Sequence, residues 1–587
     1  MTPGRSDDGA APGPSGAVTA VAPSEATSRS GPGAPPAPSG DDRPPWRPSR
    51  VTMVADRTGD VIPRRGAVAV PSVVAGVGLA LSLPPWGFWI LAFPAAGLLW
   101  WRLGGLRPRT RLWAGWLCGL GCYVPGLAFA RSFTLPGALV LIAVEALFMG
   151  VACLAVPRGP AWARALAFPA AMTLAEAVRQ TWPFGGLPIG GVFLGQAGGP
   201  LLGTARLGGP LALTAVVYTG GVALGAIGTA VARAGRDHRR IRAFRQVDAA
   251  TAGTSPVHGA LAGLGSLAGV AAVGLAVVVG TGVVATHAPD GGPSVGTVTA
   301  AAVQGGGVRG FAKSQVDPAT VLAAAVAATD ELGRRAGDPA PQLVLWPEDV
   351  VSLDGPLDGS PEETALSALA RHLGSTLVVG VTETLSDTSF RNEVVAFGPD
   401  GSVVSRYEKV HRVPFGEYVP YRSFFAHLGD LSAVPRDAVP GTGTGVLHTP
   451  VGPLGTMISY EVFYADRGRA PVRAGAQLLI VPTNTSSYAT GQIPTQEIAA
   501  SEVQAVQQGR DLLQAAPTGF SAWIDHRGTL LARSSLGVRA IVPAVLHRRT
   551  GTTLYVRLGD LPVLAGSAVA LVAGWWLALL ARSRRYS

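Results

Sequence analysis

The sequence predicts a polytopic α-helical membrane domain of about eight spans that carries an inserted α/β domain. The first observation is the composition: 48% of residues are hydrophobic and 14% are charged, with a mean hydropathy of +0.32. Soluble domains contain nearly twice that share of charge. The second observation is a series of apolar runs on both sides of one block, residues 294–549. The third is the alternation of short apolar strands with helical segments inside that block.

Apolar runs outside the block define the membrane domain. Several of them approach the ~20 residues that cross a bilayer core. The first two runs are short and flank Leu83-Pro84-Pro85-Trp86, where we expect a kinked hairpin. The eight runs cover about 67–83, 87–101, 112–130, 136–156, 162–178, 209–232, 259–286 and 561–581.

Arginines between the runs predict the topology. They gather before the first run, after the second, fourth and sixth runs, and after the eighth, whereas the other intervals contain few. This alternation follows the positive-inside rule for a chain with both termini in the cytoplasm. It predicts a multi-pass protein of a cytoplasmic membrane, with the 294–549 block on the extracytoplasmic face.

The same reasoning sets the domain boundaries. Residues 1–66 are rich in Pro, Gly, Ser and Ala, so we expect a disordered cytoplasmic tail. Residues 67–290 form the transmembrane domain of seven spans. The block 294–549 follows, then an eighth span at 561–581 and a cytoplasmic tail at 582–587.

Charge and cysteine usage exclude several classes of function. The net charge of +10 comes from arginines at the ends of apolar runs, not from a basic face with interleaved aromatics, so no nucleic-acid partner is predicted. The three cysteines, Cys118, Cys122 and Cys153, all fall in apolar runs and have no nearby histidine. We therefore expect no disulfide, no metal and no cofactor.

Charged residues within the membrane segments are candidates for function. Glu145 lies inside the fourth run, and Glu176 and Arg179 are spaced to pair on one helix face near the end of the fifth. We favour a structural ion pair for Glu176 and Arg179. The stretch 182–191 is apolar but rich in Pro and Gly, which predicts a re-entrant or interfacial loop on the side of the block.

The block places three chemically active residues at strand ends. Glu348, Lys409 and Ser459 each lie at or just beyond the end of a predicted strand, where crevices form in α/β folds. The predicted strands are 298–303, 342–346, 377–381, 393–397, 403–407, 455–459, 478–482, 512–517 and 521–525, with helices at 320–332, 362–373, 463–473 and 496–508.

Lys409 is unusual for this chain. Of the 47 basic residues counted as Lys or Arg, only Lys313 and Lys409 are lysine. Lysine is a compact point charge whose pKa shifts readily on burial, whereas arginine prefers planar, two-pronged partners. A lysine in a site can hold a developing oxyanion or move a proton. The alternative is that two lysines simply fall somewhere in a long chain.

One motif joins these residues into a family pattern. It runs Tyr407-x-Lys409-x-His411-x-Val413-Pro414-Phe415-Gly416-Glu417-Tyr418-x-Pro420. With it, the chain resembles the apolipoprotein N-acyltransferase family over about residues 67–581, and the block resembles the nitrilase (carbon–nitrogen hydrolase) superfamily. Supporting matches are Val303-Gln304-Gly305, Trp346-Pro347-Glu348, Asn392, Tyr460-Glu461, Thr483-Asn484, Gly509-Arg510 and Thr518-Gly519-x-Ser521.

The resemblance implies a nitrilase-like αββα sandwich and a ping-pong acyl transfer. It implies Glu348 as general base, Lys409 as stabiliser of the tetrahedral oxyanion and Ser459 at the nucleophile position. Glu417, Tyr460 and Glu461 would support the site and help to position the substrate. An acyl chain would pass from a phospholipid donor to the enzyme, and then to the N-terminal diacylglyceryl-cysteine of a lipoprotein.

The sequence departs from the family pattern at several positions, which leaves alternatives open. Ser459 stands where the family has Cys, and a hydroxyl needs an adjacent base to act as a nucleophile. Gln504 and Gln507 stand where an Arg and a Glu are usual. One alternative is a catalytically impaired homologue that binds lipoproteins or a partner acyltransferase; another is a membrane-tethered amidase. The presence of Glu348 and Lys409 disfavours the first.

Overall fold

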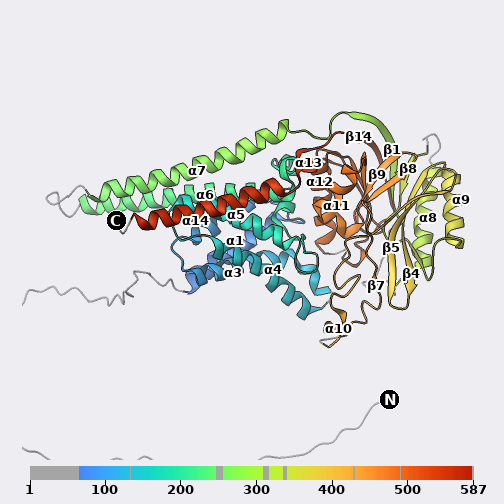
Figure 1. Cartoon of the computed structure of the whole chain (residues 1–587), viewed down its shortest axis with the longest axis horizontal. Helices are drawn as coiled ribbons and strands as arrows, with labels where there is room; N and C mark the ends of the chain where they lie inside the picture. Colours follow the sequence, from blue (N-terminus) through green and yellow to red (C-terminus); the bar gives the residue numbers. More distant parts are fainter. Residues whose placement is uncertain are drawn as a thin grey trace, which may run out of the picture. The chain divides into compact units, whose positions relative to one another are not determined.

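The computed structural model describes residues 65–132, 134–245, 255–307, 316–334, 340–427, 430–488 and 491–584. The predicted tail 1–66 lies outside the described residues except for its last two, and so do residues 585–587 of the tail 582–587. Each predicted apolar run falls in a helix (Figure 1). These helices are α1 (Arg65–Ser82), α2 (Ala92–Arg102), α3 (Pro108–Gly126), α4 (Leu135–Ala155), α5 (Ala161–Arg179), α6 (Ala205–Arg245), α7 (Ser255–His287) and α14 (Leu561–Ser583).

Four stretches of helix are long and apolar enough to cross a membrane. Among the described residues they are Leu135–Ala155, Leu202–Arg236, Leu264–His287 and Leu561–Ser583, and Gly66–Ser82 is a shorter apolar helix. A membrane domain therefore fits the helical part of the chain. The count of eight spans stays a prediction, because α2, α3 and α5 are shorter, less apolar or interrupted by charged residues.

Small residues allow the helices of this domain to approach one another closely. A Cβ atom on Gly119 of α3 would lie 2.5 Å from the Cα of Ala146 on α4, and one on Gly115 would lie 2.4 Å from the Met149 carbonyl oxygen. Such close approach through glycine is typical of packed membrane helices, where van der Waals contact drives association.

The block 294–549 folds into two β-sheets. The first has the order β14-β1-β2-β4-β5-β6, with β3 paired to β4 and β7 paired to β5; the second has the order β13-β12-β11-β10-β9-β8. The strands of the first sheet are β1 (Ser294–Gln304), β2 (Leu343–Leu345), β3 (Val351–Leu353), β4 (Thr376–Ser386), β5 (Ser389–Phe397), β6 (Val403–Glu408), β7 (Asp437–Ala438) and β14 (Ala540–Arg549). Those of the second are β8 (Val446–Thr449), β9 (Gly452–Thr456), β10 (Leu478–Pro482), β11 (Leu512–Ala515), β12 (Ala522–Ile524) and β13 (Leu530–Arg533).

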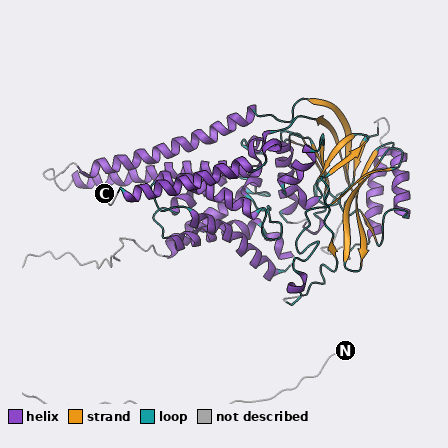
Figure 2. Cartoon of the chain, in the orientation of Figure 1, coloured by secondary structure: helices purple, strands orange, loops and turns teal. Residues whose placement is uncertain are grey.

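The two sheets pack face to face with helices on both outer sides (Figures 1 and 2). Successive side chains of a strand point to opposite faces. Val378 of β4 accordingly joins the core between the sheets, whereas Leu377 and Val379 pack toward the outer helices. Those helices are α8 (Pro318–Arg334) and α9 (Pro361–Leu373) on the first sheet, with α11 (Ala465–Arg473) and α12 (Ile493–Gln508) on the second. The predicted αββα sandwich is confirmed.

Two details of the predicted secondary structure are wrong. The strand expected at 455–459 ends at Thr456, and Ser459 instead begins the 3₁₀ turn η6 (Ser459–Phe463). The helix expected at 463–473 consequently starts later, with α11. Ser459 has a φ of +49°, which an extended strand excludes. The sequence prediction also missed β14, although this strand pairs along the length of β1.

Candidate active site

Three strand ends supply the predicted catalytic residues. Glu348 lies three residues beyond the end of β2, Lys409 directly follows β6 and Ser459 lies three residues beyond β9. The first two strands belong to the eight-stranded sheet and the third to the six-stranded sheet. Because the two sheets face each other, their loops meet at one end of the sandwich.

Buried Glu348 and Lys409 form one group with half-buried Glu417, which we call the strand-end cluster. The Lys409 Nζ lies 2.8 Å from the Glu348 Oε1 and 2.7 Å from the Glu417 Oε1. The Asn392 side-chain amide donates to the same two oxygens, at 2.8 and 3.3 Å. The Val413 N–H donates to the second Glu417 oxygen at 2.8 Å. One ammonium therefore faces two carboxylates within a network of fixed donors.

Burial sets the proton affinity of this cluster. Burial, together with the negative charges of Asp349 and Glu417, raises the pKa of Glu348 to about 7 against the attraction of Lys409. Burial lowers the pKa of Lys409, but the attraction of the two carboxylates outweighs it, so this pKa lies above its usual value. At neutral pH the lysine is thus a fixed cation, and Glu348 is poised to accept or release a proton.

Glu461 joins the Lys409 loop to the Ser459 turn. This carboxylate is fully buried and accepts the backbone N–H groups of Val410 at 2.8 Å, His411 at 3.0 Å and Ile458 at 2.9 Å. It also accepts the Tyr407 hydroxyl at 2.9 Å. A surface-charge role is ruled out by this burial. Glu461 is a positioning residue, because it fixes the segment after Lys409 against the segment before Ser459.

Ser459 sits at the start of η6 in the left-handed region, with a φ of +49°. Non-glycine residues adopt this conformation at a cost of about 1–3 kcal/mol, and the surrounding contacts must impose it. The side chain is half-buried, and its hydroxyl makes no hydrogen bond within the described part of the chain. The hydroxyl is therefore not tied to the strand-end cluster in this state, although Glu461 holds the two segments together.

Tyr460 points away from the strand-end cluster and contacts the membrane domain. Its hydroxyl donates to the Gly186 carbonyl oxygen at 3.0 Å, and the Tyr464 hydroxyl donates to the same oxygen at 2.8 Å. Gly186 belongs to the apolar loop 182–191 that follows α5. The predicted position of this loop on the side of the block agrees with these contacts. They anchor the Ser459 turn on the membrane domain.

A second cluster, Glu145, Glu176 and Arg179, holds that loop; we call it the helix cluster. Arg179 contacts Glu176 at 2.8 Å, as the spacing predicts, and also Glu145 of α4 at 3.1 Å. It further donates to the carbonyl oxygens of Pro188 at 3.2 Å and Ile189 at 3.0 Å. Arg179 therefore links α4, α5 and the loop 182–191 through a single side chain.

Sequence reasoning missed the role of Gln504 on α12. Its side-chain N–H groups donate to the carbonyl oxygens of Val462, within η6, at 2.8 Å and of Tyr464, the residue after η6, at 2.9 Å. The Gln507 amide donates to the Gln504 oxygen at 2.7 Å. This neutral pair satisfies buried polar groups without the desolvation of ions. A glutamine in a helix carries no sequence signal for such a role.

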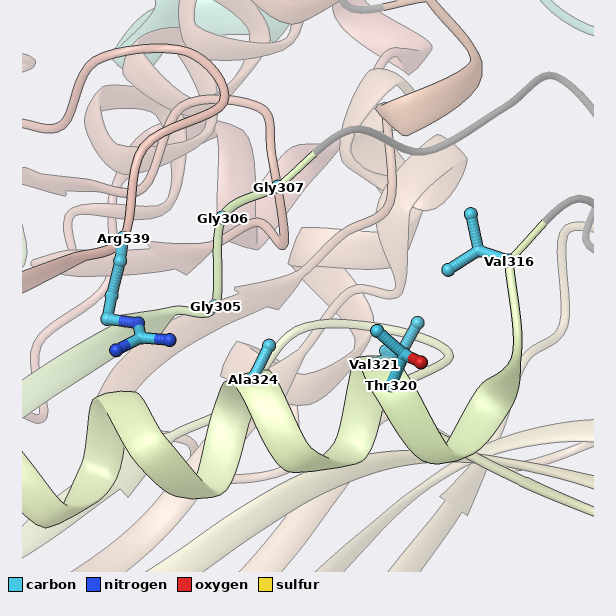
Figure 3. A pocket seen from close by; sticks show the side chains of 8 residues that line it. All are labelled: Gly305, Gly306, Gly307, Val316, Thr320, Val321, Ala324 and Arg539. Atoms are coloured by element: carbon cyan, nitrogen blue, oxygen red, sulfur yellow. The ribbon is translucent and has the colours of Figure 1, made fainter.

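An open pocket elsewhere in the block is separate from these residues. It lies between the end of β1 and α8 and is lined by Gly305, Gly306, Gly307, Val316, Thr320, Val321, Ala324 and Arg539 (Figure 3). Arg539 is the charged residue of this lining, and no residue of the strand-end cluster contributes to it. Within the described ranges, no group of three or more His, Cys, Asp or Glu side chains is placed to hold a metal ion.

Two family models match the chain and divide it where the fold does. Apolipoprotein N-acyltransferase N-terminal domain matches residues 75–223, and Carbon-nitrogen hydrolase matches residues 299–551. A solved structure of the nitrilase superfamily, Nit3 of Saccharomyces cerevisiae, is 21% identical and covers 43% of this chain and 91% of its own, with a TM-score of 0.33.

Curated relatives match over most of the chain. The apolipoprotein N-acyltransferase of Mycolicibacterium smegmatis is 31% identical over an alignment of 545 residues that covers 88% of this chain and 87% of the relative. That of Allorhizobium ampelinum is 27% identical over an alignment of 514 residues that covers 81% of this chain and 89% of the relative. Both matches run through the membrane helices and the sandwich. The chain therefore belongs to the apolipoprotein N-acyltransferase family.

Proposed function

We propose that this protein transfers an acyl chain from a phospholipid to the N-terminal diacylglyceryl-cysteine of apolipoproteins, through an acyl-enzyme on Ser459. Family membership supports the reaction. The observation that carries the assignment of residues is the strand-end cluster, a buried lysine between two carboxylates, joined through Glu461 to the turn of Ser459. The anchoring of that turn on an apolar loop suits a substrate that comes from the bilayer.

In the first half-reaction Ser459 acts as nucleophile and Glu348 as general base. Glu348 takes the hydroxyl proton as the Ser459 oxygen attacks the carbonyl carbon of the phospholipid ester. The carbonyl oxygen becomes an oxyanion, which the Lys409 ammonium stabilises. The intermediate collapses when the ester bond to the glycerol oxygen breaks. Glu348 returns the proton to that oxygen, so the products are a lysophospholipid and an acyl-Ser459 ester.

The second half-reaction uses the same groups, but Ser459 is now the leaving group. The α-amino group of the diacylglyceryl-cysteine attacks the acyl-Ser459 carbonyl, and Lys409 again faces the oxyanion. Glu348 accepts a proton from the attacking nitrogen and gives it to the Ser459 oxygen as the ester bond breaks. The products are an amide on the lipoprotein and free Ser459.

Serine in place of a thiolate makes the base essential. A hydroxyl has almost no anionic form near neutral pH and needs a carboxylate or imidazole to accept its proton. Glu348, with its pKa raised to about 7, is a stronger base than an ordinary glutamate and matches that need. Glu417 contributes by keeping a second negative charge beside Lys409.

The proposal includes a topology of eight spans with both termini in the cytoplasm and the sandwich outside. The alternation of arginines between apolar runs supports it. So do the contacts of loop 182–191 with η6, because that loop follows an odd-numbered run and belongs to the outer side in this topology. The acyl donor is then a phospholipid of the outer leaflet.

A labelled acyl chain tests the function directly. The purified protein in detergent micelles is incubated with phospholipid that carries a radiolabelled acyl chain, and hydroxylamine-labile label is mapped to Ser459. Addition of a diacylated lipopeptide should discharge the label and give an amide product. Ser459→Ala should abolish both signals, whereas Ser459→Cys should retain them. Label and amide that survive Ser459→Ala would exclude Ser459 as the nucleophile.

A further inference from the structure

Arg412 lies three residues after Lys409 and is held in one orientation. Its guanidinium stacks over the Tyr418 ring, with 4.0 Å from the Arg412 Cζ to the ring centroid. One of its N–H groups donates to the Ala438 carbonyl oxygen at 2.7 Å. The side chain is half-buried. Stacking on an aromatic ring and one backbone bond preorganise the planar group and leave other N–H donors unused.

The charge of Arg412 has no ion-pair partner within the described part of the chain. Asp437 of β7 precedes Ala438, but its carboxylate already accepts the Arg422 guanidinium at 3.1 Å and the Val419 N–H at 2.9 Å. Asp437 is therefore paired with Arg422, and it attracts Arg412 only from beyond ion-pair distance. A half-buried, ordered guanidinium without a carboxylate is a site for an anion.

The surroundings of Arg412 indicate what kind of molecule carries that anion. The Tyr418 hydroxyl donates to the Phe184 carbonyl oxygen of loop 182–191 at 3.2 Å. The Phe184 ring contacts the rings of Phe415 and Tyr421 edge to face, with centroids 6.0 and 6.1 Å apart. Phe184 and Tyr421 are 37% and 75% exposed, so this aromatic group is open to a ligand. A cation beside exposed aromatic rings suits an amphiphile with an anionic head and apolar chains.

We infer that Arg412 binds the phosphate of the acyl-donor phospholipid, through the N–H groups that Tyr418 and Ala438 leave free. This inference rests on the proposed function. Of the two proposed substrates the phospholipid always carries a phosphodiester, whereas the diacylglyceryl-cysteine does not. Arg412 thus acts in the first half-reaction and has no part in the second.

The test compares donors with and without phosphate. The rate of acyl-Ser459 formation is measured with labelled phosphatidylglycerol and with labelled diacylglycerol, which has the same ester but no phosphate. Arg412→Gln should lower the rate with phosphatidylglycerol by roughly ten- to hundredfold, the size of one charge-assisted contact. It should leave the rate with diacylglycerol within about twofold.

Three matched variants complete the design. Arg412→Lys keeps the charge without the planar fork and should lose less than Arg412→Gln. Tyr418→Leu removes the ring that orients the guanidinium and should reduce the preference for phosphatidylglycerol in the same direction. Arg422→Gln/Asp437→Asn removes a paired cation together with its carboxylate and should leave the donor preference unchanged. Release of a preformed acyl group to the lipopeptide should be equal in wild type and Arg412→Gln, which shows that the variant is folded.

Each outcome has one meaning. Equal loss with both donors in Arg412→Gln, or no loss with either, would overturn the inference while wild-type labelling of Ser459 upholds the proposed function. Absence of label in the wild type would instead reject the proposed function. Glycerol 3-phosphate at millimolar concentration should not compete with phosphatidylglycerol; strong competition would assign the site to a soluble phosphate and overturn the lipid assignment.

Discussion

The strand-end cluster and the helix cluster each place one cation between two carboxylates, yet they use the cation differently. The Lys409 ammonium has three N–H groups and gives one to each carboxylate, so one is left for a substrate oxygen. Arg179 directs its donors to both of its carboxylates and to the carbonyl oxygens of loop 182–191. The strand-end cluster therefore has one N–H donor free for a substrate, whereas the donors of Arg179 in the helix cluster are all used.

This difference shows why an ammonium suits a reactive site and a guanidinium suits a structural one. A guanidinium retains its proton at any physiological pH and has a planar array of donors, which suits it to fix several groups at once. An ammonium is a point charge that stabilises a new negative charge wherever it develops. The helix cluster therefore holds the loop that contacts Tyr460 and Tyr464, and in the proposed mechanism the strand-end cluster faces the reacting atoms.

The largest expected effect comes from exchanging the cation type in the strand-end cluster. Lys409→Arg keeps the charge, but the larger planar group saturates its donors on the two carboxylates and displaces the substrate oxygen. We expect acyl-Ser459 formation to fall by roughly 10²–10³-fold, the loss typical of an oxyanion donor. Radiolabel on Ser459 in single-turnover experiments measures this rate.

The converse exchange, Arg179→Lys, is the control for that prediction. It should lower thermal stability but should change the single-turnover rate much less than Lys409→Arg does. Comparable rate losses in the two variants would show that both clusters act in the same way and would remove the distinction between them.

Removal of the cation from the helix cluster should give the next largest effect, on stability. Arg179→Met leaves the carboxylates of Glu145 and Glu176 buried without their cation, which is expected to destabilise the fold by about 3–5 kcal/mol. Thermal unfolding in detergent micelles measures the change. The triple variant Glu145→Gln/Glu176→Gln/Arg179→Met removes the whole ion cluster and should recover part of the loss. A triple variant no more stable than Arg179→Met would contradict an electrostatic origin.

A smaller effect is expected on the pH dependence of the first half-reaction, which changes in the strand-end cluster should shift and changes in the helix cluster should not. Burial raises the pKa of Glu348 to about 7, and the base form exists above that value, so the rate should rise as the pH passes through about 7. The negative charge of Glu417 contributes to the raised pKa of Glu348. Glu417→Gln removes it and should move the midpoint to lower pH while also reducing the rate.

The same profile measured for Glu176→Gln is the comparison. That carboxylate lies in the helix cluster, so its loss should leave the midpoint where it is in the wild type. A midpoint that stays constant in Glu417→Gln would show that Glu348 is not the group that titrates.

Much of the fold could be predicted from local pattern. Apolar runs of helical length became helices, and short apolar runs such as Leu343–Leu345 became buried strands. β14 escaped prediction because Pro543 interrupts it and because it ends in His547, Arg548 and Arg549. The structure explains the proline: β14 is an edge strand paired on one side with β1, where a missing N–H does little harm.

The sequence nominated residues for the site but did not reveal how they connect. The family resemblance implied roles for Glu348, Lys409 and Ser459, and these roles stay predictions. It did not reveal that Ser459 leaves the strand for a left-handed turn, since Glu461 links the Ile458 N–H beside that turn to the Val410 N–H, which is distant in sequence. Nor did it reveal the contact of Glu145 with Arg179, which joins two helices across 34 positions and has no spacing rule.

The smallest expected effect concerns the link between the two domains. The Gly186 carbonyl oxygen accepts both the Tyr460 and the Tyr464 hydroxyl, so either one satisfies it when the other is removed. Tyr464→Phe should therefore cost only about 0.5–1 kcal/mol, and Tyr460→Phe about the same. The double variant leaves a buried carbonyl oxygen without a donor and should cost more than the sum of the single changes. Thermal unfolding and single-turnover labelling of the four proteins close a double-mutant cycle. Additive losses would show that the two hydroxyls act independently, and the turn of Ser459 would then be fixed by the sandwich alone.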